Sequence, residues 1–140
     1  MIVYAESSAV LAWLLGEPSG GGVRRVLSGA DRVVSSALTA LESAGALARA
    51  HATGRVGRTE QLAALRLLDV AETGWDVHAV SDRVLARARA GFPEEPVRTL
   101  DAIHLATASL FRDAIGPMTL LSFDERIRSN ARALGLEVGP

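Results

Sequence analysis

The hydrophobic positions of the chain fall into short β-prone runs that alternate with longer stretches of helical spacing. The short runs predict strands at residues 2–5, 32–34, 75–80, 118–123 and 136–138. The longer stretches predict helices at residues 9–15, 22–27, 37–52, 59–72 and 82–90, one that begins at Thr99 and one that ends at Leu134. Because strands that alternate with helices are typical of a parallel sheet covered on both faces, we expect one three-layer α/β/α domain over residues 1–140, with a central parallel sheet of about five strands.

The composition agrees with one folded domain. The chain has 140 residues, of which 49% are hydrophobic and 22% are charged, so disorder is excluded and one sizeable core is expected. The longest runs without a charged residue, such as 7–16 and 102–111, have ten residues, whereas a membrane span needs about twenty. No basic segment precedes an apolar stretch in the manner of a secretion signal, so we expect a cytoplasmic protein.

The residue types that are missing exclude several classes of chemistry. The sequence contains no cysteine, which excludes disulfides, thiol catalysis and thiolate metal sites. All fifteen basic residues are arginine, so there is no lysine for a Schiff base, a phosphate-binding loop or a phosphotransfer receiver domain. The formal net charge of −1 excludes a general polyanion binder, and any affinity for nucleic acid therefore depends on where individual arginines lie.

Four acidic residues interrupt otherwise uncharged segments. They are Glu6 directly after the first strand, Glu42 inside the helix at residues 37–52, Asp101 in the first turn of a later helix, and Asp124 at a strand-to-helix junction. Unpaired carboxylates in apolar surroundings are costly, and one shared cation would neutralise all four. Strand ends and helix starts share one edge of a parallel sheet, so these acids predict a hard-cation site there. Oxygen ligands alone favour Mg²⁺, or alternatively Mn²⁺, over zinc.

Each acid also has a purely structural interpretation. Asp124 has the residue type of a helix N-cap, and Asp101 stands where a negative charge complements a helix dipole. Glu42 could pair with Arg49 or face water. Glu6 is a poor capping residue, so a structural role is least convincing at that position. A shared site explains all four positions together.

Polar neighbours of these acids are secondary candidates. Ser7 and Ser8 are expected to cap the helix at residues 9–15, although Ser7, like Ser122, is also placed to hold water or phosphate beside the acids. His104 follows Asp101 by one helical turn and could orient a ligand. A histidine within an Ala-Ile-His-Leu-Ala run is more often a hydrogen-bonded core residue.

Four segments that contain the acids form a characteristic set. They are YAESSAVLAWLLGEP at residues 4–18, LTALESAGALAR at 38–49, LDAIHLATA at 100–108 and LLSFDERIRSNARALGLEV at 120–138. In order and spacing these segments resemble the PIN-domain family, and most closely the toxin ribonucleases of VapBC toxin–antitoxin pairs. The resemblance covers nearly the whole chain, and its last two motifs are the most specific.

The resemblance implies a PIN-like fold and a Mg²⁺- or Mn²⁺-dependent endoribonuclease that acts as the toxin of a type II toxin–antitoxin system. It also implies a homodimer that a cognate VapB-type antitoxin silences. Position by position, it implies that Glu6, Glu42, Asp101 and Asp124 are the catalytic, metal-binding acids, with Ser122 in the family's usual Ser/Thr place. The chain departs from the family at Glu6, where the usual residue is the shorter aspartate.

The chemistry of the residues agrees with phosphodiester hydrolysis, which needs an activated water and a neutralised phosphate. Divalent ions held by carboxylates supply both without lysine or cysteine. Glu6, Asp101 and Asp124 are the expected ligands, and Glu42 is expected to be a ligand or to orient the attacking water. Candidates for holding the RNA backbone are Arg49, Arg126 and Arg128.

A second interpretation from a different class remains open. In it the chain is a non-catalytic PIN-fold module that only binds a partner, its activity lost through Glu6. Metal-dependent cleavage of RNA distinguishes the two. In both interpretations the apolar faces of residues 9–15 and 55–72 are expected to form a dimer seam and a groove for an antitoxin helix.

Overall fold

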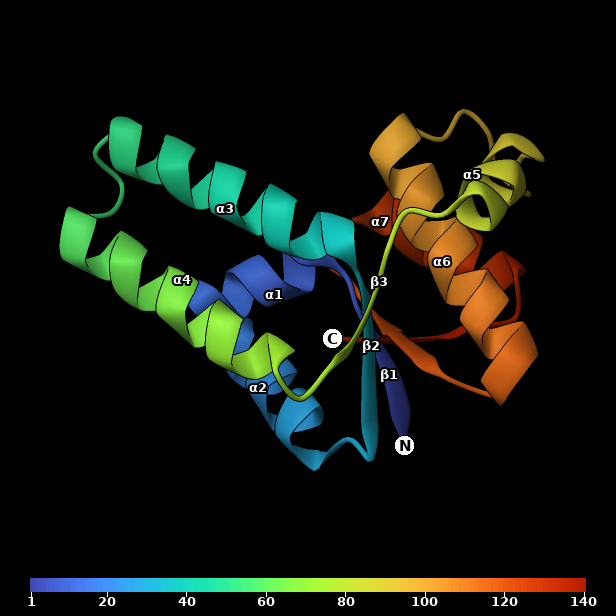
Figure 1. Ribbon diagram of the computed structural model, residues 1–140, viewed down its shortest axis with the longest axis horizontal. Helices are drawn as coiled ribbons and strands as arrows, with labels where there is room; N and C mark the ends of the chain where they lie inside the picture. Colours follow the sequence, from blue (N-terminus) through green and yellow to red (C-terminus); the bar gives the residue numbers. More distant parts are fainter.

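The centre of the protein is a parallel five-stranded sheet with the strand order β3-β2-β1-β4-β5 (Figure 1). A computed structural model describes residues 1–140. The strands are β1 Ile2–Ala5, β2 Arg32–Ser36, β3 Asp76–His78, β4 Thr119–Leu121 and β5 Glu137–Gly139. This confirms the predicted sheet. The two predicted strands at 75–80 and 118–123 are shorter in the structure, because only their middle residues pair with a neighbour.

Seven helices cover the two faces of the sheet. They are α1 Ser7–Leu14, α2 Gly20–Gly29, α3 Ala37–Ala52, α4 Arg58–Glu72, α5 Asp82–Arg89, α6 Thr99–Ile115 and α7 Glu125–Ala133. Figure 1 shows α1 to α4 on one side of the sheet and α5 to α7 on the other, so the predicted three layers are present. The long α3 and α4 form a hairpin that extends beyond the sheet (Figure 1). None of the seven helices is both long and apolar enough to cross a membrane.

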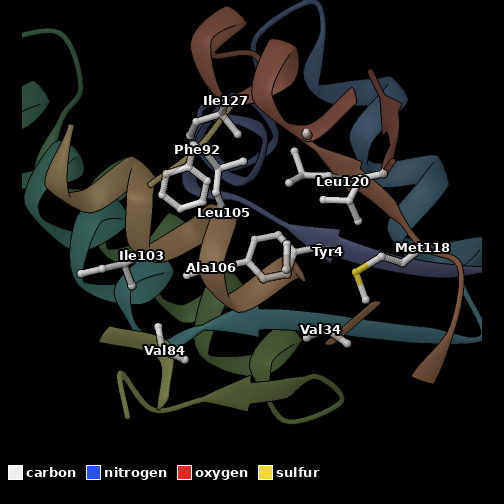
Figure 2. Close-up of a cluster of buried hydrophobic side chains, with 13 residues drawn as sticks. Tyr4, Val34, Val84, Phe92, Ile103, Leu105, Ala106, Met118, Leu120 and Ile127 are labelled. Atoms are coloured by element: carbon white, nitrogen blue, oxygen red, sulfur yellow. The ribbon is translucent and has the colours of Figure 1, made fainter. Parts of the chain in front are cut away.

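The alternation of side chains along the strands divides the core into two clusters. In β1, Val3 and Ala5 pack into the cluster beneath α1, α2 and α4. Tyr4 points the other way, into the cluster beneath α6 and α7 (Figure 2). The second of these clusters is the larger one and contains Leu105 and Leu120, both fully buried. The central strand is therefore covered on both faces, as a parallel sheet requires.

The first helix begins one residue after β1, and this corrects one prediction. Glu6 occupies the N-cap position of α1 without a side-chain cap bond, and Ser7 and Ser8 lie within the first turn. The two serines therefore do not cap the helix. The Ser7 hydroxyl instead donates to Glu42 of α3, and the Ser8 hydroxyl donates to Glu6, two residues earlier. A local capping pattern cannot reveal such contacts, because the partners are distant in sequence or aligned by the turn itself.

Candidate functional site

The carboxyl edge of the sheet brings the four acids to one end of the molecule. The backbone N–H of Glu6 donates to the carbonyl of Leu121 at 3.1 Å, so the ends of β1 and β4 are joined directly. Asp124 follows β4 by three residues, while α3 and α6 bring Glu42 and Asp101 to the same edge. The order of the elements predicted this location from the sequence.

Glu6 is a buried carboxylate without a cation. Its residue is 4% exposed, and none of the ion pairs of the protein includes it. Its Oε2 accepts a hydrogen bond of 2.5 Å from the hydroxyl of Ser8. The same hydroxyl accepts from the backbone N–H of Phe123 at 2.8 Å and lies 3.2 Å from the hydroxyl of Ser122. The end of β4 is thereby tied to the carboxylate that follows β1.

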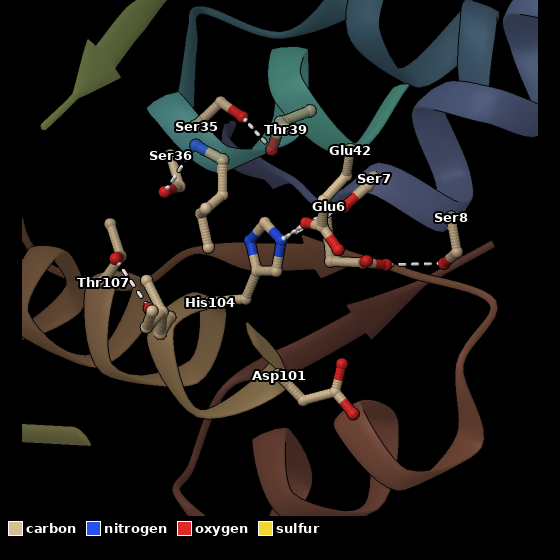
Figure 3. A network of polar contacts seen from close by, with 12 residues as sticks. Glu6, Ser7, Ser8, Ser35, Ser36, Thr39, Glu42, Asp101, His104 and Thr107 are labelled. Atoms are coloured by element: carbon tan, nitrogen blue, oxygen red, sulfur yellow. Dashed lines mark hydrogen bonds and ion pairs between the residues drawn. The ribbon is translucent and has the colours of Figure 1, made fainter. Parts of the chain in front are cut away.

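A second group of polar side chains surrounds Glu42 (Figure 3). Its Oε1 accepts hydrogen bonds from Ser7 Oγ at 2.7 Å and from His104 Nε2 at 2.5 Å. Because a carboxylate only accepts, His104 carries a hydrogen on Nε2, and in the neutral ring Nδ1 accepts from the Tyr4 hydroxyl at 2.9 Å. His104 is fully buried, which confirms that it is a hydrogen-bonded core residue. The bond to Glu42 also connects it with the acids.

The surroundings of Glu42 and Tyr4 shift the pKa values of both groups. Burial raises the pKa of Glu42, but the hydrogen bonds from His104 and Ser7 outweigh it, so the pKa lies below its ordinary value. Burial and the negative charges of Glu6 and Glu42 hold the pKa of Tyr4 well above its usual range. Glu42 is therefore ionised at neutral pH, while the phenol of Tyr4 is neutral. It pairs with His104 and Ser7, so the expected alternative of a pair with Arg49 is wrong.

Asp101 and Asp124 form a third group, joined by Arg98. The guanidinium donates from Nε to Asp101 Oδ2 at 2.9 Å and from a terminal nitrogen to Asp124 Oδ2 at 3.0 Å. The hydrogen bond and charge of Asp101 raise the pKa of Arg98 above its usual value. Asp124 also caps α7, since its Oδ1 accepts from the backbone N–H groups of Arg126 and Ile127. Its capping role and its place at the acidic edge are compatible, because they use different oxygens.

The donor chemistry of this edge fits a hard divalent cation. All candidate ligands are carboxylate or hydroxyl oxygens, as Mg²⁺ and Mn²⁺ prefer, and the buried Glu6 has no cation of its own. As the side chains stand, however, no three His, Asp or Glu side chains are gathered closely enough to hold an ion. Asp101 lies apart from Glu6 and Glu42 in Figure 3. A cavity of about 280 Å³ opens here, lined by Glu42, Arg98, Thr99, Leu100 and Asp101.

The sequence did not single out Arg98, although it precedes Asp101 by three residues, the spacing of neighbours on one helix face. Of the arginines that it did single out, Arg128 donates to the carbonyl groups of Ser122 and Gly139 at 2.7 and 2.6 Å. Arg128 therefore fixes the end of β4 to β5. Arg49 is exposed and makes no ion pair.

Comparison with known proteins identifies the family. Residues 3–133 match the family model described as PIN domain. Ribonuclease VapC46 of Mycobacterium tuberculosis is 37% identical over 136 residues, which cover 97% of this chain and 95% of that protein.

Solved structures show the same fold. The crystal structure of VapC20 from Mycobacterium tuberculosis, described as a sarcin-ricin loop cleaving toxin, has a TM-score of 0.65 at 18% identity and covers 91% of this chain and 93% of that one. The structure of VapBC2 from Rickettsia felis, bound to a DNA fragment from its promoter, has a TM-score of 0.63 at 11% identity, with coverage of 99% and 98%. Because the family match spans nearly the whole chain and VapC46 is similar along its full length, the chain belongs to the PIN domain family and is of the VapC type.

Proposed function

We propose that the protein is a divalent-metal-dependent endoribonuclease and the toxin of a type II toxin–antitoxin pair. The observation that carries the proposal is Glu6, a buried carboxylate without a cation at the carboxyl edge of the sheet, an edge that it shares with three further acids. A buried charge of this kind is costly to the fold unless a function requires it. The relative VapC46, named a ribonuclease, supports RNA as the substrate. A cytoplasmic location follows from that substrate.

The side chains of the acidic edge have distinct roles in the proposed reaction. Glu6, Asp101 and Asp124 would hold Mg²⁺ or Mn²⁺, which would supply Lewis-acid stabilisation of the phosphate and activation of water. Glu42 stays ionised and is held in one direction by His104 and Ser7, so it orients the water that attacks phosphorus. The water oxygen forms a bond to phosphorus while the phosphorus–oxygen bond to the leaving nucleotide breaks. The water gives up one proton to solvent and the leaving oxygen takes one from solvent, so the protons balance.

Glu6 also predicts how fast this chain works. Its carboxylate stands one methylene farther from the backbone than an aspartate, and the backbone is fixed because the Glu6 carbonyl accepts from Val10 N–H at 3.1 Å. Mg²⁺ demands near-octahedral geometry at about 2.0–2.1 Å, so the extra length has to be absorbed by the side chain. A misplacement of about 1 Å costs on the order of a hundredfold in rate. We expect a competent but slow nuclease.

The proposed partners are an antitoxin helix and a second copy of the chain. Leu62, Leu67 and Val70 of α4 are 44%, 42% and 64% exposed, as expected of a face that another chain covers. Hollows between α1, α2 and α4 are lined by Trp13, Leu14 and other apolar side chains. An amphipathic helix from the antitoxin fits such a groove. The structure of VapBC2 from Rickettsia felis, which has the same fold, supports this kind of partner.

The proposal is tested by cleavage of structured and single-stranded RNAs by antitoxin-free protein. We expect cleavage with Mg²⁺ or Mn²⁺ that stops in EDTA and is lost in Asp101→Asn. The matched control is Asp113→Asn, which changes an exposed aspartate paired with Arg112 at the other end of α6. Cleavage that survives EDTA, or equal cleavage by Asp101→Asn, contradicts the proposal. No cleavage by the unchanged protein on any RNA favours the non-catalytic module.

A further inference from the structure

We propose that Arg98 is a displaceable internal cation. Its guanidinium holds Asp101 and Asp124 together, and when a divalent ion binds these acids it would turn outward to a backbone phosphate of the substrate RNA. This inference rests on the proposed function and assigns a role to a residue of the same site.

The first argument is the geometry of the contacts. Arg98 uses two different nitrogens for two carboxylates, at 2.9 Å to Asp101 and 3.0 Å to Asp124. Asp101 belongs to the first turn of α6, and Asp124 is the N-cap of α7, so the guanidinium bridges two elements far apart in sequence. The positive charge of Arg98 thus offsets the negative charges of Asp101 and Asp124, which a bound metal ion would otherwise neutralise.

The second argument is that only these two acids hold the Arg98 side chain. Asp101 and Asp124 are its only hydrogen-bond partners, and the backbone position of Arg98 as N-cap of α6 uses no side-chain bond. Its side chain is 63% exposed, whereas those of Asp101 and Asp124 are 12% and 26% exposed. Once a metal ion neutralises these two acids, no hydrogen bond to another group retains the guanidinium, and it is free to point toward solvent and substrate.

Arg128 shows the contrast. Its side chain is 21% exposed and is held by backbone carbonyl groups, whose hydrogen bonds do not depend on the charge of any acid at the site. A metal ion bound by the acids leaves those bonds intact. The Arg98 side chain, by contrast, bonds to two proposed metal ligands, is exposed, and has no hydrogen bond to any other group. The guanidinium of Arg98 at the edge of the site suits a phosphate group. It can bind a phosphate with two nitrogens, as it now binds the two acids.

The experiment is a calorimetric titration of Mn²⁺ into the metal-free full-length chain, with Arg98→Gln and the matched control Arg66→Gln. Arg66 is an exposed arginine of α4 that makes no ion pair. Removing a competing and repelling positive charge at an exposed site is expected to strengthen Mn²⁺ binding of Arg98→Gln by roughly threefold to tenfold. Arg66→Gln is expected to bind as the unchanged protein does.

A second measurement follows the outward position. Binding of a single-stranded RNA is measured in Mn²⁺ at several salt concentrations, in a Glu42→Gln background that lacks the carboxylate proposed to orient the attacking water, so that the RNA stays intact. Loss of one phosphate contact in Arg98→Gln should weaken binding and lower the slope of log affinity against log salt by about 0.7. The slope of Arg66→Gln should stay unchanged.

The outcomes separate this inference from the proposed function. Equal or weaker Mn²⁺ binding by Arg98→Gln, beside clear binding by the unchanged protein, overturns the inference and leaves the metal site standing. An unchanged salt slope overturns the outward position. Absence of Mn²⁺ binding by the unchanged protein overturns the proposed function and the inference together. Stronger Mn²⁺ binding with a reduced slope supports the inference.

Discussion

Replacing His104 by leucine should destabilise the fold, because it removes hydrogen bonds from the buried polar cluster of Tyr4, Glu42 and His104. The imidazole is fully buried, and its loss removes a hydrogen bond to the ionised Glu42 and another to the Tyr4 hydroxyl. A bond to a charged group contributes about 1.5–3 kcal/mol and a neutral one about 0.5–1.5 kcal/mol. The Glu42 side chain is 25% exposed and keeps its bond from Ser7, so the first value is taken near its lower limit.

The sum is a loss of about 2–4 kcal/mol in the free energy of unfolding. For a chain of this size it corresponds to a fall in melting temperature of roughly 6–12 °C. The assay is urea unfolding in EDTA at neutral pH, and the slope of the free energy against urea is expected to stay unchanged. His104→Gln, whose amide retains a donor for Glu42, should recover part of the loss.

A double-mutant cycle with Glu42→Gln isolates the contact between the two side chains. Residues that share a short charge-assisted hydrogen bond should show a coupling of about 1 kcal/mol or more, whereas independent sites add. If His104→Leu costs less than about 0.5 kcal/mol, the ordinary effect of a surface change, the reasoning fails. It also fails if the two substitutions are additive, since the bond at 2.5 Å would then contribute nothing specific.

Three further predictions follow from other parts of the structure. Tyr4 is the sole tyrosine and its pKa lies well above 10, so tyrosinate absorbance of the native protein should stay flat as the pH passes 10 and rise only with unfolding; a smooth native titration there would contradict its burial. Because the pKa of Glu42 is lowered in the folded protein, its contribution to the free energy of unfolding is complete above the ordinary pKa of 4.5 and is lost as the pH falls through the pKa of the folded state. Glu42→Gln should therefore flatten the acid side of a plot of unfolding free energy against pH. Gly20→Ala should cost about 1–3 kcal/mol in urea unfolding, because a Cβ there would stand 2.2 Å from the Ala12 carbonyl oxygen, whereas Gly21→Ala meets no atom within 4 Å and should be neutral or slightly stabilising.

The sequence predicted the order of strands and helices because each element carries its own signal. The helix at residues 37–52 was predicted with the bounds that α3 has, since its alanine- and leucine-rich stretch is followed by a glycine-marked turn. The acids could also be placed at one edge, because the carboxyl ends of parallel strands share it.

The contacts between the site residues were not predictable from local patterns. Ser7 and Ser8 have the residue types of helix caps, yet the helix begins at Ser7 and both hydroxyl groups bond to carboxylates. Arg98 lies among prolines and acids in a loop-like segment, and its second contact, with Asp124, arises only when the starts of α6 and α7 meet. Such tertiary pairings require the relative placement of elements, which periodicity does not contain.

The measurement that tests the central claim most directly is the rate of Mn²⁺-dependent RNA cleavage by the chain with Glu6, Glu6→Asp and Glu6→Gln, with melting curves to verify folding. A metal-holding carboxylate at this position predicts that Glu6→Gln loses cleavage while it keeps the fold, and that Glu6→Asp retains or raises the rate. Equal cleavage by the unchanged chain and a folded Glu6→Gln would contradict the account, because the buried carboxylate that carries it would then have no part in the reaction.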